Sequence, residues 1–474
     1  MGKLTPACHT NYLEISSMAQ LGDAIARYHK LLEQPSYRET GWAEQFQEQM
    51  RQQHLVESGR LLAPVLRPHF ISRRQLDALS RLSKQMAEIM DRLEAIAFAS
   101  PLLLNRLQML PAEKMLAALP HGYARSGVTA SMDANLTNGS LSLQGMDACK
   151  PAGLAYSNML AELFLELPIL KEFKRGRYKL TKLGGPKSLL QAIQSAYRQF
   201  GGKRKPAIAI VELGQESGSG PAATETASSE GRLLAESLSQ LGGHVRLIPP
   251  ELLEYTGGKL HSEDFAIDLV FRRVSTREIL TRWDLSHPLL RAYRDGTVCV
   301  VNSFRAEFAQ RRALFDLLTD ETVTAHLPTA DRKLIRNSIA WTRVVVPRKT
   351  MHGDKQVDLP EFILNQREHL ALLPNEDSSD QRIYIGAEMT AAAWDRALKL
   401  ALRTPYVVQE RSSPVHESFP LFQYGEFKMK EAEVTVHPHV LNGEMSGASA
   451  VLQTCLAGSA AHLAVAPVFL LEET

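Results

Sequence analysis

Between residues 205 and 319, short apolar segments alternate with segments of helical periodicity. The apolar segments are KPAIAIVEL at 205–213, HVRLI at 244–248, AIDLVFRRV at 266–274 and TVCVVNS at 297–303, and the helical ones are 232–241, 276–283 and 306–319. Strands that alternate with helices are typical of a parallel sheet covered by its crossover helices. The sequence therefore predicts an α/β chain with a mostly parallel central sheet.

The segments on either side follow other patterns. Before this region, apolar residues recur every three or four positions, which predicts helices at 21–32, 42–55, 72–98 and 111–119, with Ser72 as the cap of the longest. The run NGSLSLQ at 138–144 predicts a β-hairpin, because Asn-Gly precedes an alternating run. After it, we expect strands at 382–386, 406–410, 421–441 and 445–454 and a helix at 390–402, which together form an α+β lobe.

Composition excludes several classes of protein. A chain of 474 residues, 44% hydrophobic and 22% charged, can form two or three lobes at ~150 residues per domain. Its net charge of +2 argues against a dedicated nucleic-acid binder, and its apolar runs fall far short of the ~20 residues of a membrane span. Residues 1–10 lack the apolar core of a secretory signal, so we expect a cytoplasmic protein. Cys8, Cys149, Cys299 and Cys455 are widely spread, which favours reduced thiols.

Basic residues are concentrated in one segment. Residues 171–205 contain eleven Lys or Arg and one acid, Glu172, and they include the glycine-bearing run TKLGGPKSLL at 181–190. This segment is either a solvated face and a plain turn, or a phosphate-binding site in which Lys182 and Lys187 flank a helix N-terminus. Arg305 and Arg312 also have two interpretations: they are ordinary surface arginines, or they are cations that bind a phosphate or carboxylate.

A histidine pair raises the alternative of a metal cluster. His437 and His439 would project from one face of a strand, with His416, His462 and Cys455 near them in sequence. The absence of a third ligand at tight spacing favours core or exposed histidines instead. The sequence contains no nucleophile elbow, His-Glu-x-x-His helix or Cys-x-x-Cys pair, so hydrolase triads and zinc chemistry lose support.

Three stretches carry a resemblance to a known family. They are DANLTNGSLSLQGMDACKPAG at 133–153, VVNSFRAEFAQRRALFDLLTDE at 300–321, and the region from LLPNEDSSDQRIYIGAEM at 372–389 to YVVQE at 406–410. Together they resemble circularly permuted ATP-grasp proteins, in particular the glutathionylspermidine synthetase-like ones. The resemblance implies that ATP binds between two α+β lobes, that a substrate carboxylate is phosphorylated, and that an amine displaces the phosphate.

The same resemblance implies a magnesium site. Phosphoryl transfer needs Mg²⁺ on the phosphates, held by carboxylate and amide oxygens. The first family acid corresponds to Asp133, and the later Glu-x-Asn corresponds to Gly145, Met146 and Asp147. The glutamate is therefore missing, and Asp147 replaces the asparagine as an oxygen ligand. Asp133 and Asp147 are the expected metal ligands.

The residues expected at the nucleotide are also altered. The family's phosphate strand, Leu-Lys-Pro-Asn, corresponds to 372–375, so that Leu373 replaces the lysine and Asn375 is retained. Glu376, Asp377 and Asp380 then place three acids near a triphosphate, which is unfavourable. Near the end of the chain, a family Asn and its glycines correspond to Gly458 and to 462–464.

Two contacts to ATP remain in this reading. The strand at 406–410 would grip adenine largely through backbone atoms, and its residues at that position are Val408, Gln409 and Glu410. Arg312, or the basic turn with Lys182 and Lys187, would contact phosphate.

Four regions and two hypotheses follow. We expect a helical region at 1–125, a permuted ATP-grasp segment with a remnant metal site at 126–204, a central α/β lobe at 205–305 and a nucleotide-binding lobe at 306–474. One hypothesis is an ATP- and Mg-dependent carboxylate–amine ligase acting on small molecules. The other is a catalytically degenerate relative that acts as a binding or scaffold subunit, with a protein partner such as an intact paralogue. Neither hypothesis involves nucleic acid or a membrane.

Overall fold

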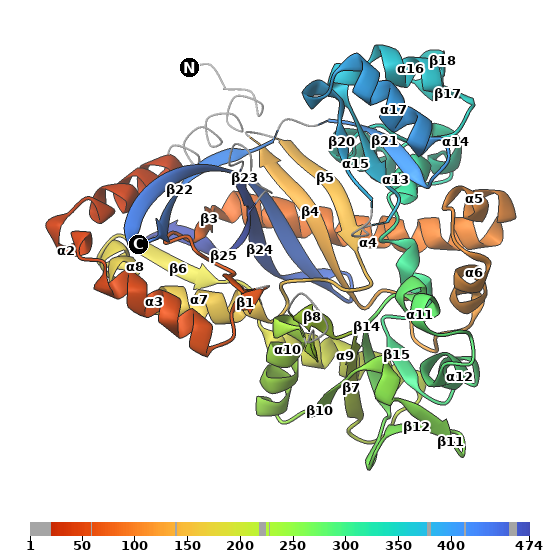
Figure 1. Ribbon diagram of the computed structural model, residues 1–474, viewed down its shortest axis with the longest axis horizontal. Coiled ribbons are helices and arrows are strands. Elements are labelled where there is room, and N and C mark those ends of the chain that lie inside the picture. Colours follow the sequence, from red (N-terminus) through yellow and green to blue (C-terminus); the bar gives the residue numbers. More distant parts are fainter. Residues whose placement is uncertain are drawn as a thin grey trace, which may run out of the picture.

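The structure is a computed structural model that describes residues 20–57, 59–137, 140–217, 224–226, 228–376, 381–411, 414–454 and 462–474. Its largest element is an eight-stranded sheet in the order β3-β25-β24-β23-β4-β5, with β22 on β23 and β6 on β25 (Figure 1). The strands are β3 (His69–Ile71), β4 (Thr129–Thr137), β5 (Ser140–Asp147), β6 (Tyr178–Lys182), β22 (His416–Gln423), β23 (Glu426–Leu441), β24 (Glu444–Thr454) and β25 (His462–Glu473).

The predicted hairpin is confirmed within this sheet. Strands β4 and β5 pair antiparallel from Thr137 opposite Ser140 to Ser131 opposite Asp147, and the intervening Asn-Gly lies outside the described residues. On its other edge β4 pairs with β23, and the paired residues, such as Ala134 and Val436, are more than 300 positions apart in the chain. The sheet therefore brings the middle and the end of the sequence together.

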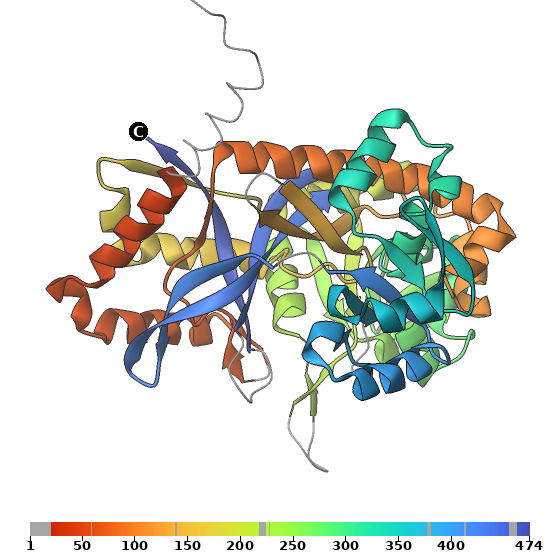
Figure 2. The same cartoon turned by 90° about the horizontal axis from the view of Figure 1, so that it is seen from above.

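The long helix predicted at 72–98 is also confirmed, as α4 (Arg73–Ala99). Ser72 and Gln75 form a capping box at its start, and Leu79, Leu82, Met86 and Ile89 are buried along one face. This helix packs on β23, β24 and β25 and ends against α5 (Pro101–Arg106) and α15 (Thr329–Ser338) (Figure 2). It thus connects the large sheet with the opposite end of the molecule.

The remaining helices before residue 186 pack in different places: those at 156–174 lie on the large sheet, whereas that at 111–118 packs on the segment 304–308. Residues 20–32 are helical, followed by α2 (Pro35–Arg38), α3 (Gly41–Gln52) and α6 (Pro111–Ala118), and the segments after the hairpin form α7 (Tyr156–Glu166) and α8 (Pro168–Lys174). Two short strands, β1 (Val56–Glu57) and β2 (Arg60–Leu61), pair with each other.

The central lobe has the predicted parallel sheet. Its order is β10-β7-β14-β15, and each neighbouring pair is parallel. The elements are β7 (Ala207–Glu212), β10 (His244–Ile248), β14 (Leu269–Arg273) and β15 (Cys299–Val301), with α9 (Pro186–Phe200), α10 (Ser229–Gln240), α11 (Thr276–Arg282) and α12 (Pro288–Arg294). A small sheet of β11 (Glu254–Thr256), β12 (Lys259–Ser262) and β13 (Phe265–Ala266) projects from this lobe (Figure 1).

A smaller lobe lies at one end of the molecule (Figure 1). Its four-stranded sheet has the order β16-β21-β19-β20, packed with α13, α16 and α17. The elements are α13 (Ala313–Leu318), α14 (Glu321–Thr324), β16 (Thr342–Val344), β17 (Lys349–His352), β18 (Lys355–Asp358), α16 (Leu359–Asn365), β19 (Leu370–Pro374), β20 (Tyr384–Ile385), α17 (Ala391–Ala401) and β21 (Tyr406–Glu410). Residues 306–474, expected as one nucleotide-binding lobe, thus supply described strands to three sheets: this four-stranded one, the β17–β18 pair and the large sheet.

One predicted helix is wrong in its extent. Instead of a continuous helix at 306–319, the chain forms a 3₁₀ turn (Phe304–Phe308) and then α13. The chain turns between them because the backbone N–H groups of Arg312 and Ala313 donate to the backbone and side-chain oxygens of Asn375, 2.9 and 2.8 Å away. A continuous helix would have used these donors internally.

Two further sequence predictions bear on the fold. Cys149 and Cys299 are buried free thiols, whereas Cys8 and Cys455 lie outside the described residues. Within the described part of the chain, the structure contains no helix that combines the length and apolar character needed to cross a membrane.

Candidate functional site

Seven polar side chains meet where the large sheet faces the ends of the parallel strands. We call this set the polar junction, and its members are Asp133, Asp147, Glu212, Glu230, Arg273, His437 and His439. Ligands of open α/β sheets bind beyond the carboxyl ends of parallel strands, which is where β7 and β14 end here. The junction is therefore the place in this fold where a polar ligand site is expected.

The hairpin supplies the two aspartates that the sequence analysis singled out. Asp133 lies opposite Gly145, and Asp147 lies opposite Ser131, so both aspartates project from the same face of β4 and β5. A β-carbon added to Gly145 would lie 2.2 Å from Asp133 Oδ2. The Asp133 side chain therefore occupies the space into which a side chain at 145 would extend.

Asp147 is engaged in the turn that follows β5. Its Oδ1 accepts hydrogen bonds from the backbone N–H groups of Cys149 and Lys150, at 2.7 and 3.0 Å. Burial raises the pKa of Asp147 despite these hydrogen bonds and the nearby Arg273 guanidinium. Lys150 pairs with Glu278 of α11 at 2.5 Å, so the turn is also fixed to the central lobe.

The two histidines of β23 extend the junction. His437 Nδ1 lies 3.5 Å from Asp133 Oδ1, and His439 Nε2 lies 3.2 Å from Ser449 Oγ. His439 is 4% exposed, and burial, with a contribution from His437, lowers its pKa to about 3. His439 is thus a neutral core residue at physiological pH. His416 lies on another strand, and the side chains of 455 and 462 lie outside the described residues.

Arg273, at the end of β14, is a junction residue that the sequence analysis missed. Its guanidinium lies 3.2 Å from both Glu212 and Glu230 and donates to the Pro151 carbonyl at 3.1 Å. Burial raises the pKa of Glu230, although Arg273 opposes the shift. The available signal was an arginine pair ending the otherwise apolar segment AIDLVFRRV, since a charge at the end of a buried strand needs a partner.

These contacts do not suit a magnesium ion held as the resemblance implies. Among the described residues, no group of three or more His, Cys, Asp or Glu side chains is placed to hold a metal. Asp133 has glycine across the hairpin where a second carboxylate is expected, and one oxygen of Asp147 is already used by its turn. Metal binding by Asp133 and Asp147 stays a prediction.

The structure brings Arg312 and Asn375 together, but both make contacts within the chain. Asn375 is 1% exposed, with its Oδ1 bonded to the Ala313 N–H and its Nδ2 donating to the Leu107 carbonyl at 2.9 Å. Arg312 Nη1 donates to the Pro374 carbonyl at 2.9 Å. Asn375 therefore positions the end of β19 rather than presenting its amide to a ligand.

The residues of the expected phosphate strand and adenine strand likewise make contacts within the chain. Leu373 is partly buried and packs against the apolar core that includes Val344 and Val407, where an ammonium group would lose its hydration. Strand β21 is paired with β16 on one edge and β19 on the other through Val408 and Gln409, so an adenine finds no unpaired backbone along it. The Gln409 side chain donates to Thr342 Oγ1, and Glu410 pairs with His352 at 2.7 Å.

The basic turn lies far from these residues. Lys182 is on β6 and pairs with Glu162 at 2.7 Å, and Lys187 is exposed in the first turn of α9. Figures 1 and 2 place β6 and α13 toward opposite ends of the molecule. Gly184 has a φ of +81°, and a β-carbon on it would lie 2.9 Å from Gly447 Cα. Close packing against β24 therefore explains why residue 184 is a glycine. This agrees with the alternative that the run at 181–190 is a plain turn.

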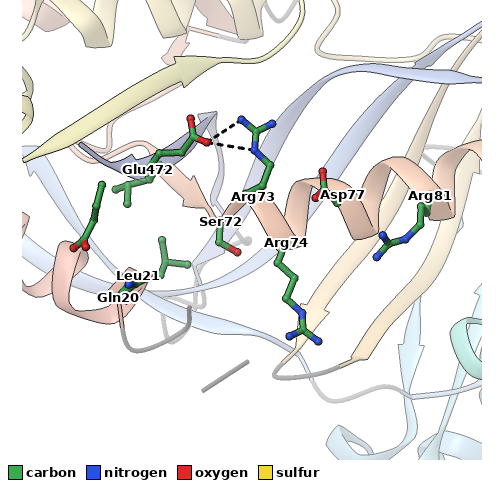
Figure 3. A pocket seen from close by; sticks show the side chains of 10 residues that line it. Gln20, Leu21, Ser72, Arg73, Arg74, Asp77, Arg81 and Glu472 are labelled. Atoms are coloured by element: carbon green, nitrogen blue, oxygen red, sulfur yellow. Dashed lines mark hydrogen bonds and ion pairs between the residues drawn. The ribbon is translucent and has the colours of Figure 1, made fainter. Parts of the chain in front are cut away.

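A surface pocket of about 410 Å³ lies away from the polar junction, where α4 begins beside the end of β25 (Figure 3). Arg73 pairs with Glu472 at 2.9 Å across it, while Asp77, Arg74 and Arg81 follow along the exposed side of the helix. Positive and negative side chains are balanced in its lining. None of the sequence-predicted site residues lines this pocket.

Comparison with solved structures identifies the fold. A glutathione synthetase-like effector from Globodera pallida, solved in its apo form, superimposes with a TM-score of 0.57 and 12% sequence identity, covering 93% of this chain and 99% of that one. No family model matches the sequence, and no curated protein matches it. The chain thus has an ATP-grasp-like, mixed α/β fold. Circular permutation stays a prediction.

Two other solved structures are similar over smaller parts. A putative gamma-glutamylcysteine synthetase from Methylobacillus flagellatus has a TM-score of 0.39 and 11% identity, covering 80% of this chain and 82% of its own. The ATP-grasp ligase PsnB, complexed with a minimal precursor, has a TM-score of 0.26 and 12% identity, covering 55% of this chain and 90% of its own.

Proposed function

We propose that this protein uses an ATP-grasp-like fold as a non-catalytic binding or scaffold subunit. The observation that carries this proposal is that the partly buried Leu373 packs against an apolar core, at the position where the resemblance places the phosphate-binding lysine. Removing that ammonium takes away a charge that stabilises the phosphates during transfer. The use of Asn375 and Asp147 in hydrogen bonds within the chain supports the same conclusion.

A second candidate function is the ATP-dependent carboxylate–amine ligase. The polar junction favours it, because Asp133 and Asp147 share one face of the hairpin beside the buried cation Arg273. The ligase would act on a small carboxylate and a small amine.

Thermal stability with and without Mg-ATP separates the two functions. A ligand at 100 times its dissociation constant stabilises a folded protein by ~2.7 kcal/mol. We expect no stabilisation at millimolar Mg-ATP and no release of ADP in the presence of carboxylates and amines. Saturable stabilisation together with ADP release that is lost in Asp133→Asn would instead establish the ligase.

A further inference from the structure

Four charged side chains from four different elements form a closed cluster beside the end of β19. Glu113 comes from α6, Arg277 from α11, Arg311 from the turn before α13, and Glu376 from the residue after Asn375. Arg311 lies 2.7 Å from Glu113 and also pairs with Glu376. Arg277 lies 3.1 Å from Glu376 and 4.0 Å from Glu113. We call this set the Glu376 cluster.

The cluster is balanced in charge and largely buried. The side chains of Glu113 and Arg311 are each 1% exposed, that of Glu376 is 14% exposed and that of Arg277 is 39% exposed. Removing a charge from water is costly unless an opposite charge lies beside it. The Glu376 carboxylate is therefore required to balance the charge of the two guanidinium groups that it contacts.

The position of Glu376 in the fold makes this cluster a connection between lobes. Glu376 follows β19 of the small lobe, whereas Arg277 belongs to the helix after β14 of the central lobe, and Glu113 belongs to the N-terminal helices. From the sequence alone, Glu376 is one of three acids expected to oppose a triphosphate. The structure shows instead that arginines neutralise it.

We propose that Glu376 is an internal anion that holds the small lobe against the central lobe, in the place of a bound phosphate or carboxylate. Arg277 and Arg311 form the two arms of an anion site, and the chain fills that site with its own carboxylate. Bidentate guanidinium groups bind phosphate and carboxylate alike, so an added anion can substitute for Glu376 once its charge is removed. The lobes are thereby held together without nucleotide.

The test is amide hydrogen exchange in Glu376→Gln. We expect exchange in β19 and β21 to become at least tenfold faster than in the wild type, because the connection across the lobes is lost, while exchange in β7 and β14 is unchanged. Millimolar tripolyphosphate should restore the protection in Glu376→Ala, which loses the same charge and leaves space between the two arginines, and leave the wild type unaffected. The matched control is Glu388→Gln, an exposed carboxylate of the same lobe that forms no ion pair within the described residues.

Each outcome decides a part of the proposal. Exchange in Glu376→Gln that stays at the level of Glu388→Gln would overturn the connection, and faster exchange in Glu376→Ala without rescue by tripolyphosphate would overturn the anion site. If Glu376→Gln does not fold, Arg277→Gln removes the more exposed arm, and unchanged exchange in that variant overturns the proposal. The readout uses no ATP, so it is independent of whether the protein is a ligase.

Discussion

Buried charged side chains are numerous in this fold, and their pairing accounts for several contacts between distant segments. The Arg272 and Glu307 side chains are 0% and 1% exposed and lie 2.6 Å apart, which fixes the end of β14 to the segment after β15. Arg67, also 0% exposed, pairs with Glu417 at 2.9 Å and lies over the Phe419 ring. Breaking such a pair leaves an uncompensated buried charge, which is more costly than the pair is stabilising.

His439 should make the stability of the protein depend on pH. Its pKa is about 3 in the folded state against 6.5 ordinarily, so the unfolded chain binds a proton first as pH falls. Stability is therefore lost as pH falls below 6.5, by about 2 kcal/mol between pH 7 and pH 5. Denaturant unfolding at both pH values should show this loss of stability between pH 7 and pH 5 in the wild type, and a smaller loss in His439→Gln. The exposed His416 provides the control, since His416→Gln should lose as much stability between the two pH values as the wild type. An equal loss in His439→Gln would contradict the role given to His439.

For single elements, both local capping residues and tertiary contacts determine where a helix begins and ends. Helix α4 begins where its capping box lies, because Ser72 accepts from the Gln75 N–H and the Gln75 side chain accepts from the Ser72 N–H. By contrast, the helix expected at 306–319 is interrupted by Asn375, which is remote in sequence. Local signals thus determine an end when nothing competes for the backbone donors.

The capping box predicts a measurable loss of stability. Ser72→Ala leaves the Gln75 N–H of α4 without its side-chain acceptor, so we expect the free energy of unfolding to fall by about 1 kcal/mol. Urea denaturation followed by circular dichroism is the measurement. Ser239→Ala on the exposed side of α10 is the control and should change stability by less than about 0.5 kcal/mol. Equal effects of the two variants would show that the cap contributes nothing.

For the whole molecule, the lobes are joined by buried ion pairs as well as by apolar packing. Asp316 of α13 is 0% exposed and lies 2.8 Å from Arg106 and 2.6 Å from Arg348. Arg106 follows the long helix that packs on the large sheet, and Arg348 belongs to the small lobe. Asp316 therefore joins the small lobe to α5, the helix that follows α4, much as the Glu376 cluster joins the small and central lobes.

Removing the charge of Asp316 should destabilise this connection. Asp316→Asn removes the buried carboxylate from Arg348 and from Arg106, which keeps Asp320 at 2.8 Å, so we expect a loss of about 1.5–3 kcal/mol in the free energy of unfolding. Chemical denaturation followed by tryptophan fluorescence is suitable. Asp395→Asn, which removes an exposed i, i+4 pair with Lys399, should cost less than about 0.5 kcal/mol. A loss of that small size in Asp316→Asn would contradict the connecting role.

The sequence alone determined the elements whose signals are local. The alternation at 205–303 predicted the parallel sheet, Asn-Gly predicted the β4–β5 hairpin, and Ser72 predicted the start of α4, because periodicity, turn and cap chemistry act within a few residues. Only the tertiary structure decided what the candidate site residues do. Asn375, Glu376 and Arg273 acquire their roles from partners tens to hundreds of positions away, and burial makes those partners obligatory. The chemical types of the side chains at a site can therefore be inferred from the sequence. Whether those side chains bind a ligand or stabilise the fold cannot.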